Sequence, residues 1–313
     1  MLSRRLLRIK VIKTLYAHLK GGAENVEVSV KNLRYSVDKT YDLYYQMLWL
    51  IVEVRRYAEQ RIELGRKKQL PTPEELNPNT KFIDNALIAQ IEQSACVVDY
   101  LKKHSLGWSA YPELIRDLYN EMIESDYYKK YMSSEERTYK GDVAVVKSFF
   151  MSPALEDSEQ LEKVLEEQSI MWNDDLGMAL IMVVRTLEDC RAKHDEIPVL
   201  PEFKSEDDWK FAKSLFVDAA TNYEANLSVV EKFIANWDVE RIAFMDLLVM
   251  TTALAEVKLF PEIPTKVSLD EYIEISKYYS TPGSNVFING VLDKLVATLT
   301  AEGAIVKTGR GLK

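Results

Sequence analysis

Residues 268–301 read SLDEYIEISKYYSTPGSNVFINGVLDKLVATLTA, and this stretch decides the fold class. Ser268 and Glu271 have the spacing of a capping box, which predicts a helix that begins at Ser268 and runs to Tyr279. The Thr-Pro-Gly-Ser sequence ending at Ser284 breaks that helix, and Ser284 can cap a second helix that runs to Ala301. The stretch therefore predicts two consecutive helices joined by a tight turn.

Helical periodicity extends outward from this stretch over most of the 313 residues. No run of alternating apolar and polar residues is bounded by hairpin turns, so strands are not expected. Proline-rich loops at residues 69–79 and 197–203 interrupt the helices. The other predicted helices are Ser3–Lys20, Asp38–Gly65, Lys81–His104, Pro112–Met132, Asp142–Phe150, Ser158–Trp172, Asp174–Lys193, Glu206–Asn222, Asn226–Ala235 and Asp238–Val257. The sequence thus predicts an all-α protein.

Composition and cysteine usage exclude several classes of protein. Cys96 and Cys190 lie far apart without close Cys or His partners, so neither a zinc site nor a disulfide framework is expected. The most apolar stretch, Leu176–Val184, is too short to span a membrane, and cations interrupt the apolar runs at the start of the chain, which argues against a signal peptide. We expect a cytoplasmic protein without a membrane partner.

Residues typical of enzymes are scarce. His18, His104 and His194 are isolated, and no glycine-rich phosphate loop, nucleophile elbow or zinc-helix motif occurs. The expectation is that the protein is not an enzyme and has no catalytic residue, metal site or cofactor.

Charge is distributed unevenly along the chain. The net charge is -9, yet residues 1–23 carry six cations and no acid. On a helix, Arg5 and Tyr16 align within about 20°, and Arg8 lies roughly 80° from Tyr16. Arginine neutralises phosphate and an aromatic ring stacks on an unpaired base, so this pairing is suited to single-stranded RNA. A merely solvated basic face is the competing interpretation.

The two ends of the chain resemble one known family. The C-terminal elements are Asn236-Trp-Asp-Val-Glu-Arg-Ile-Ala243, Ala255-Glu256, Ile263-Pro-Thr-Lys-Val267, Asp270-Glu271, Ile275-Ser-Lys277 and Phe287-Ile-Asn-Gly-Val-Leu-Asp-Lys294. In order and spacing they are similar to NusB proteins, and Arg4-Arg5, Arg8 and Leu15-Tyr16 resemble the arginine-rich first helix of that family. The resemblance covers about 20 residues at the start and about 95 at the end. It implies a NusB-like helical bundle made of residues 1–37 and 204–313, interrupted by a helical insertion at 38–203, with the first helix packed against the C-terminal block.

The family resemblance also implies a function and a set of residues. It implies a factor for transcription antitermination in ribosomal RNA synthesis, which binds boxA-type leader RNA with the ribosomal protein NusE within the RNA polymerase antitermination complex. The residues expected to bind RNA are Arg4, Arg5, Arg8, Tyr16, Lys277, Tyr279 and Ser284. Those expected to bind a protein partner are Asp246, Glu256, Phe287 and Asn289, while Glu240 and Arg241 are expected to form ion pairs within a helix.

Two alternatives stay open. One is a protein-interaction scaffold that kept the fold and changed partners, because Met250-Thr251 stands where relatives often have Leu-Arg. The other, less favoured, is the RNA-binding domain of an rRNA methyltransferase, which would need a further Rossmann-like domain. Two basic segments could extend an RNA surface. One is the tail Lys307–Lys313, and the other lies near the end of the first long helix and consists of Arg55, Arg56, Arg61, Arg66, Lys67 and Lys68. The insertion becomes acidic after Pro153, at Glu156, Asp157, Glu159, Glu162, Glu166 and Glu167.

Overall fold

A computed structural model of the chain describes residues 1–22, 25–234 and 242–312. Within these ranges every regular element is a helix and no strand occurs, which confirms the all-α prediction. None of the described helices is long and apolar enough to cross a membrane. The chain forms two compact units: unit 1 comprises Met1 and Asp38–Glu202, and unit 2 comprises Leu2–Val37 and Phe203–Lys313.

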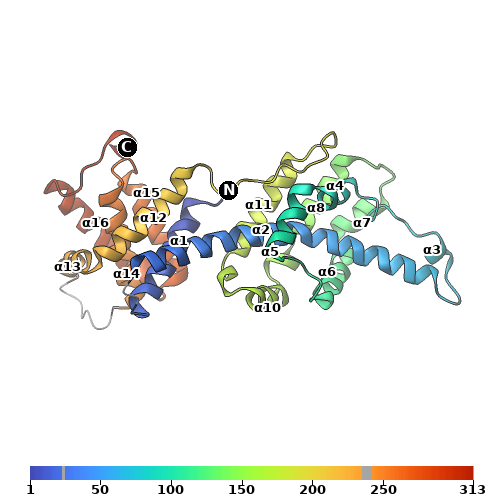
Figure 1. Ribbon diagram of the computed structural model, residues 1–313, viewed down its shortest axis with the longest axis horizontal. Coiled ribbons are helices and arrows are strands. Elements are labelled where there is room, and N and C mark those ends of the chain that lie inside the picture. Colours follow the sequence, from blue (N-terminus) through green and yellow to red (C-terminus); the bar gives the residue numbers. More distant parts are fainter. Residues whose placement is uncertain (23–24, 235–241, 313) are drawn as a thin grey trace. The chain divides into compact units, whose positions relative to one another are not determined.

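Unit 2 joins the start of the chain to its end. It contains α1 (Arg4–Lys20), the first part of α2 (Val26–Arg66), α12 (Glu206–Thr221), α13 (Tyr223–Phe233), α14 (Phe244–Leu259), α15 (Thr265–Tyr279), α16 (Ser284–Ala301) and the 3-10 helix η3 (Gly309–Leu312). Helix α1 packs against α12 and α14, with Leu7, Val11 and Leu15 fully buried (Figure 1). The N-terminal helix therefore docks on the C-terminal block, as expected from the sequence.

Unit 1 is a second helical body with its own core. It contains the rest of α2, then α3 (Pro73–Leu76), α4 (Ala86–Gln93), α5 (Ala95–His104), α6 (Pro112–Glu124), α7 (Asp126–Ser133), α8 (Tyr139–Phe150), α9 (Pro153–Glu156), α10 (Glu159–Gln168), the 3-10 helix η1 (Ile170–Trp172) and α11 (Leu176–Asp189). Leu43, Met47, Leu50 and Val54 of α2 are fully buried, at the helical spacing that the sequence shows.

Helix α2 is longer than predicted. It begins at Val26 rather than Asp38 and continues to Arg66, a length of 41 residues. Residues 26–37 contain no proline or glycine, and their β-branched valines have only a weak preference against helix. Burial of Leu33 and Val37 in unit 2 outweighs that preference. The predicted start at Asp38 was wrong, because Asp38 is a residue type that often caps helices but here lies inside one continuous helix.

Helix starts in the C-terminal block also differ from the prediction. Helix α15 begins at Thr265, after Pro264, so Ser268 and Glu271 lie within it and form no capping box. Helix α16 begins at Ser284 itself, with Gly283 at its N-cap in a left-handed conformation (φ 89°). Glycine adopts this conformation without strain. The serines expected to cap these helices are therefore free to bond elsewhere in unit 2.

The C-terminal tail is ordered against the rest of unit 2. Lys307 donates from Nζ to the carbonyls of Val257 and Phe260, and the backbone N–H of Thr308 donates to Pro261. Burial lowers the pKa of the Lys307 ammonium. The tail thus covers the end of α14, and Lys307 is engaged there instead of projecting into solvent.

Candidate nucleic-acid interface

Helix α1 has one face in the core and one face toward solvent. With about 100° of rotation per residue, Leu7, Val11, Leu15 and Ile12 occupy one continuous arc of the helix. All four are buried. Arg8 projects into the middle of this arc, between Leu15 and Ile12, and only 3% of its surface is exposed. A helical projection of the sequence therefore carried a signal that Arg8 points inward.

Arg8 forms a buried ion pair with Glu256 of α14. Its guanidinium donates from Nε and Nη2 to the two carboxylate oxygens at 2.8 and 2.6 Å. Ser268 and Tyr272 of α15 donate to the same carboxylate at 2.6 and 2.9 Å. Burial alone would lower the pKa of Arg8, but the hydrogen bond and charge of Glu256 outweigh it, so the pKa of the guanidinium is raised. This cluster joins α1, α14 and α15 inside unit 2.

Two surface roles expected from the sequence need correction here. Arg8 was expected to contact RNA and Glu256 to contact a protein partner, but Glu256 has no exposed surface and Arg8 has almost none. A bidentate arginine–carboxylate pair satisfies both charges internally. The two residues hold helices together, and neither offers a group to a ligand outside.

The solvent side of α1 carries a different set of residues. Arg5, Lys13, Tyr16 and Lys20 fall within an arc of about 80° on the helix. Tyr16 is 41% exposed and meets the ring of Phe244 edge-on at 5.4 Å between centroids. Lys20 lies over the Phe244 ring at 4.1 Å.

The end of α15 extends this surface, because Lys13 lies over the ring of Tyr279 at 5.3 Å. We call Arg5, Lys13, Tyr16, Lys20, Phe244 and Tyr279 the aromatic–basic face. Lys13, Lys20 and Phe244 were missed from the sequence as site residues. The two lysines could have been found from their position on the same arc as Tyr16, whereas Phe244 is brought there only by the fold.

The first two arginines are exposed but paired with acids. Arg5 donates to both carboxylate oxygens of Glu271 at 2.8 and 3.0 Å, and its side chain is 51% exposed. Arg4 donates to Asp208 at 3.0 Å. The Arg5–Glu271 pair is exposed and contributes at most about 1 kcal/mol of stability, so an anionic ligand can compete for the Arg5 guanidinium. Asp208 is buried, so Arg4 is held more firmly.

Asp246 organises the turn between α15 and α16. It accepts hydrogen bonds from Ser280 and from Ser284 Oγ, the latter at 2.8 Å, and Ser284 also bonds Thr281 at 2.7 Å. Burial raises the pKa of Asp246, although the hydrogen bond from Ser284 opposes this shift. Asp246 and Ser284 are both buried, so the surface roles expected for them also need correction. They fix the turn next to Tyr279.

The remaining predicted residues lie on the surface or close to it. Lys277 is exposed and pairs with Glu274 one turn before it. Asn289 is exposed on α16 and Phe287 is half-buried there. Glu240 and Arg241 lie outside the described residues, so their expected ion pairs stay a prediction.

The chemistry available at the aromatic–basic face is recognition of an anion with flat rings. Among the described residues, no group of three His, Cys, Asp or Glu side chains could hold a metal ion. The face instead combines ammonium and guanidinium groups with exposed aromatic edges. This combination binds single-stranded nucleic acid, whose phosphates meet the cations while its bases stack on the rings.

Comparison with known proteins gives matches over the C-terminal part of the chain. The NusB family matches residues 182–297. Three relatives are each called transcription antitermination protein NusB. The protein of Salinibacter ruber is 44% identical over 102 residues, which is 33% of this chain and 64% of that protein. That of Chloroherpeton thalassium is 41% identical over 83 residues, 26% of this chain and 39% of that protein.

The third relative, from Natranaerobius thermophilus, is 30% identical over 104 residues, 32% of this chain and 75% of that protein. The chain therefore spans less than two thirds of the first two relatives and three quarters of the third. No solved structure matches. The family match includes Phe244 and Tyr279 but not α1.

Proposed function

Because this chain belongs to the NusB family, a family of transcription antitermination proteins, we propose that it is a non-enzymatic RNA-binding factor for ribosomal RNA transcription. It binds single-stranded boxA-type leader RNA together with the ribosomal protein NusE, in the cytoplasm and as part of the RNA polymerase antitermination complex. The aromatic–basic face is the RNA surface. If the test below shows that this face binds no RNA, the protein is instead a protein-interaction scaffold that kept the fold and changed partners.

The single observation that carries the proposal is the juxtaposition of Tyr16, Lys20 and Phe244. The two rings meet edge-on and the ammonium group lies over one of them, so cation and aromatic surface are offered together. A base stacked on an aromatic ring contributes about 1–3 kcal/mol, and the cation neutralises the adjacent phosphate. The contacts of Lys13 with Tyr279 repeat the arrangement along α1.

The acidic remainder of the chain makes this surface the favoured place for RNA. With a net charge of -9, most of the molecule repels phosphate. The first acidic residue of the chain is Glu24, so α1 itself carries no negatively charged side chain. RNA binding is therefore expected to be local and to depend on few cations.

For the protein partner we propose contacts on α16. Phe287 and Asn289 lie on this helix near Val286, whose side chain is 72% exposed. Aromatic side chains are enriched at protein interfaces, and Phe287 supplies one here beside the exposed Val286. Asp246 and Glu256, which are buried, are not part of this surface.

The proposal is tested by the salt dependence of leader RNA binding. Lys13→Gln with Lys20→Gln removes two cations, each of which contributes about 0.7 to the logarithmic salt slope, so the slope should fall by about 1.4. Tyr16→Ala should weaken binding by about 1–3 kcal/mol with little change in slope. Affinity is measured by fluorescence anisotropy at several salt concentrations, with and without NusE.

The control removes the same charge elsewhere. Lys102→Gln with Lys103→Gln changes two exposed lysines of unit 1 and should leave the slope unaltered. Melting temperatures are recorded for every variant, because Tyr16 also packs on Phe244. Folded face variants that bind leader RNA as tightly as the parent at all salt concentrations would exclude the RNA role of this face.

A further inference from the structure

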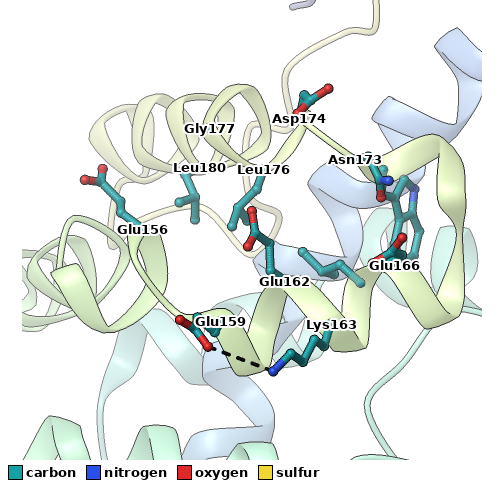
Figure 2. Close-up of a pocket in the computed structure, with 12 residues that line it drawn as sticks. Glu156, Glu159, Glu162, Lys163, Glu166, Asn173, Asp174, Leu176, Gly177 and Leu180 are labelled. Atoms are coloured by element: carbon teal, nitrogen blue, oxygen red, sulfur yellow. Dashed lines mark ion pairs between the residues drawn. The ribbon is translucent and has the colours of Figure 1, made fainter. Parts of the chain in front are cut away.

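Unit 1 contains an open groove between α9, α10, η1 and the start of α11. Its volume is about 790 Å³, which is within the range of ligand-binding clefts. Figure 2 shows the groove, with side chains of α10 along one side and the first turn of α11 along the other. All of its lining residues belong to the helical insertion, so it is separate from the aromatic–basic face.

The groove has an apolar floor. Leu165, Trp172 and Leu180 line it and are themselves buried, and Leu176 is half-buried beside them. These side chains are held by the core of unit 1. A ligand that covers the floor would therefore gain apolar contact without rearranging the protein.

The rim of the groove is acidic. Its carboxylates are Glu156, Glu159, Glu162, Glu166 and Asp174. Lys163 is the one cation among the lining residues, and its contact with Glu159 at 3.9 Å joins two largely exposed side chains. Such a pair neutralises little. Five carboxylates against one ammonium leave a net charge of -4 around the groove.

Helix stability explains only part of this charge. Glu159 and Glu162 lie in the first turn of α10, where the helix dipole favours acids. Glu166 lies near the C-terminal end, where the dipole disfavours it, and the last turn has no basic residue. Glu162 and Glu166 also repel each other at i,i+4 spacing. The rim therefore carries an acid that destabilises its own helix.

A metal ion does not account for the rim. Among the described residues, no group of three acidic, histidine or cysteine side chains converges closely enough to hold one. The labelled carboxylates in Figure 2 are spread around the opening instead of pointing to one centre. This distribution is suited to an extended ligand with several separate charges.

We propose that this groove docks a basic segment of a partner protein, with lysine or arginine side chains on the rim and an apolar side chain on the floor. Charge complementarity selects a cationic ligand and rejects nucleic acid, while the apolar floor selects a peptide over a simple polyamine. Gly177 lines the groove, and a Cβ atom at that position would meet nothing within 4 Å, so a larger side chain can be introduced there as a test.

The test uses the full chain and a synthetic fluorescent peptide of about twelve residues, in which several lysines flank a leucine–phenylalanine pair. Binding should weaken between about 50 and about 300 mM salt, and a peptide with glutamates in place of the lysines should not bind. Glu162→Lys with Glu166→Lys should weaken binding at least about tenfold. Gly177→Trp should weaken it similarly by filling the groove.

Glu167→Lys is the matched control for these variants. Glu167 is exposed on the same helix but does not line the groove. Its charge reversal should change affinity by less than about twofold. If the control weakens binding as much as Glu166→Lys alone, the attraction is non-specific and the proposal is overturned.

Thermal stability gives a second readout. Because Glu166 opposes the dipole of α10, Glu166→Lys should leave the melting temperature unchanged or raise it while peptide binding falls. A purely structural role for Glu166 would lower both. Failure of the parent protein to bind the basic peptide would overturn the proposal. A concentration-dependent dimer that the groove variants abolish would also overturn it, because the occupant of the groove would then be a second copy of this chain.

Discussion

At the scale of single residues, two arginines of α1 make the same bidentate contact with different consequences. Arg8 pairs with Glu256 in the interior, and Arg5 pairs with Glu271 at the surface. Burial removes the water that would otherwise solvate both charges. The buried pair is consequently hard to break, and the exposed pair is easily exchanged for another anion.

We expect Arg8→Ala to lower the free energy of unfolding by about 3–5 kcal/mol, because Glu256 would remain buried without a cation. Arg5→Ala is the matched control and should cost at most about 1 kcal/mol. Urea denaturation monitored by tryptophan fluorescence measures both. If both variants lost the same free energy of unfolding, burial would not distinguish the Arg8 ion pair from the Arg5 ion pair.

The residue scale also shows where sequence reasoning succeeds and fails. Tyr16 was expected on an exposed surface from its spacing, and it is partly exposed. The charge of Arg8 favours an exposed position, but its place on the helix between Leu15 and Ile12 predicts burial, and it is buried. The burial of Asp246 with Ser280 and Ser284 has no local signal, since these residues are 34 and 38 positions apart in the chain.

At the scale of elements, α5 illustrates a helix capped from a distant segment. Its N-cap residue Ser94 makes no side-chain hydrogen bond to the helix backbone. Glu196, which follows α11, instead accepts hydrogen bonds from the N–H groups of Ala95 and Cys96 and from the Ser94 hydroxyl. The Ser94 hydroxyl, with these N–H groups, lowers the pKa of Glu196 from its ordinary value of 4.5 to about 2.

This cap predicts a specific acid sensitivity. A carboxyl group whose pKa is lower in the folded state contributes stability above its unfolded pKa of 4.5 and loses it as the pH falls toward about 2. Glu196→Gln should therefore flatten the dependence of unfolding free energy on pH between these values. Urea titrations at pH 5 and pH 3 compare parent and variant, with Glu167→Gln as an exposed control. An unchanged slope in the Glu196 variant would refute the assignment.

The helices show why periodicity predicts existence better than boundaries. The predicted helix Lys81–His104 is two helices that meet at Ser94, and Pro112–Met132 is two that meet at Ser125. Apolar spacing continues through both breaks, so the pattern alone gives no warning. A serine at each break has an extended backbone and so ends one helix and precedes the next. The Ser125 side chain caps the following helix locally by accepting from the Tyr128 N–H, whereas the break at Ser94 depends on the distant Glu196.

At the scale of the whole molecule, two separate cores serve one chain. Phe149 is buried in unit 1 and Leu15 is buried in unit 2. Phe149→Ala should cost about 3–5 kcal/mol and Leu15→Ala about 2–5 kcal/mol, each within its own unit. Calorimetry should show two transitions, one lowered by each substitution.

RNA binding should distinguish the two units as well. The Phe149 variant should bind leader RNA normally at temperatures below its lowered transition, because the aromatic–basic face belongs to unit 2. The Leu15 variant should lose binding as the transition of unit 2 is reached. A single transition that both substitutions shift alike would mean that the units unfold together.

The pairing of Arg8 with Glu256 also sets an order of events during synthesis on the ribosome. The two residues are 248 positions apart, and translation adds roughly 5–20 residues per second, so Arg8 waits on the order of 12–50 s for its partner to emerge. Throughout that interval the helices of unit 1 are already available to fold, while α1 has neither α12 nor α14 to cover its leucines. Unit 1 can thus fold before α1 is covered. A nascent chain that stops short of α14 exposes the apolar face of α1 and leaves Arg8 without its carboxylate, and exposed apolar surface of this kind is what chaperones and proteases bind.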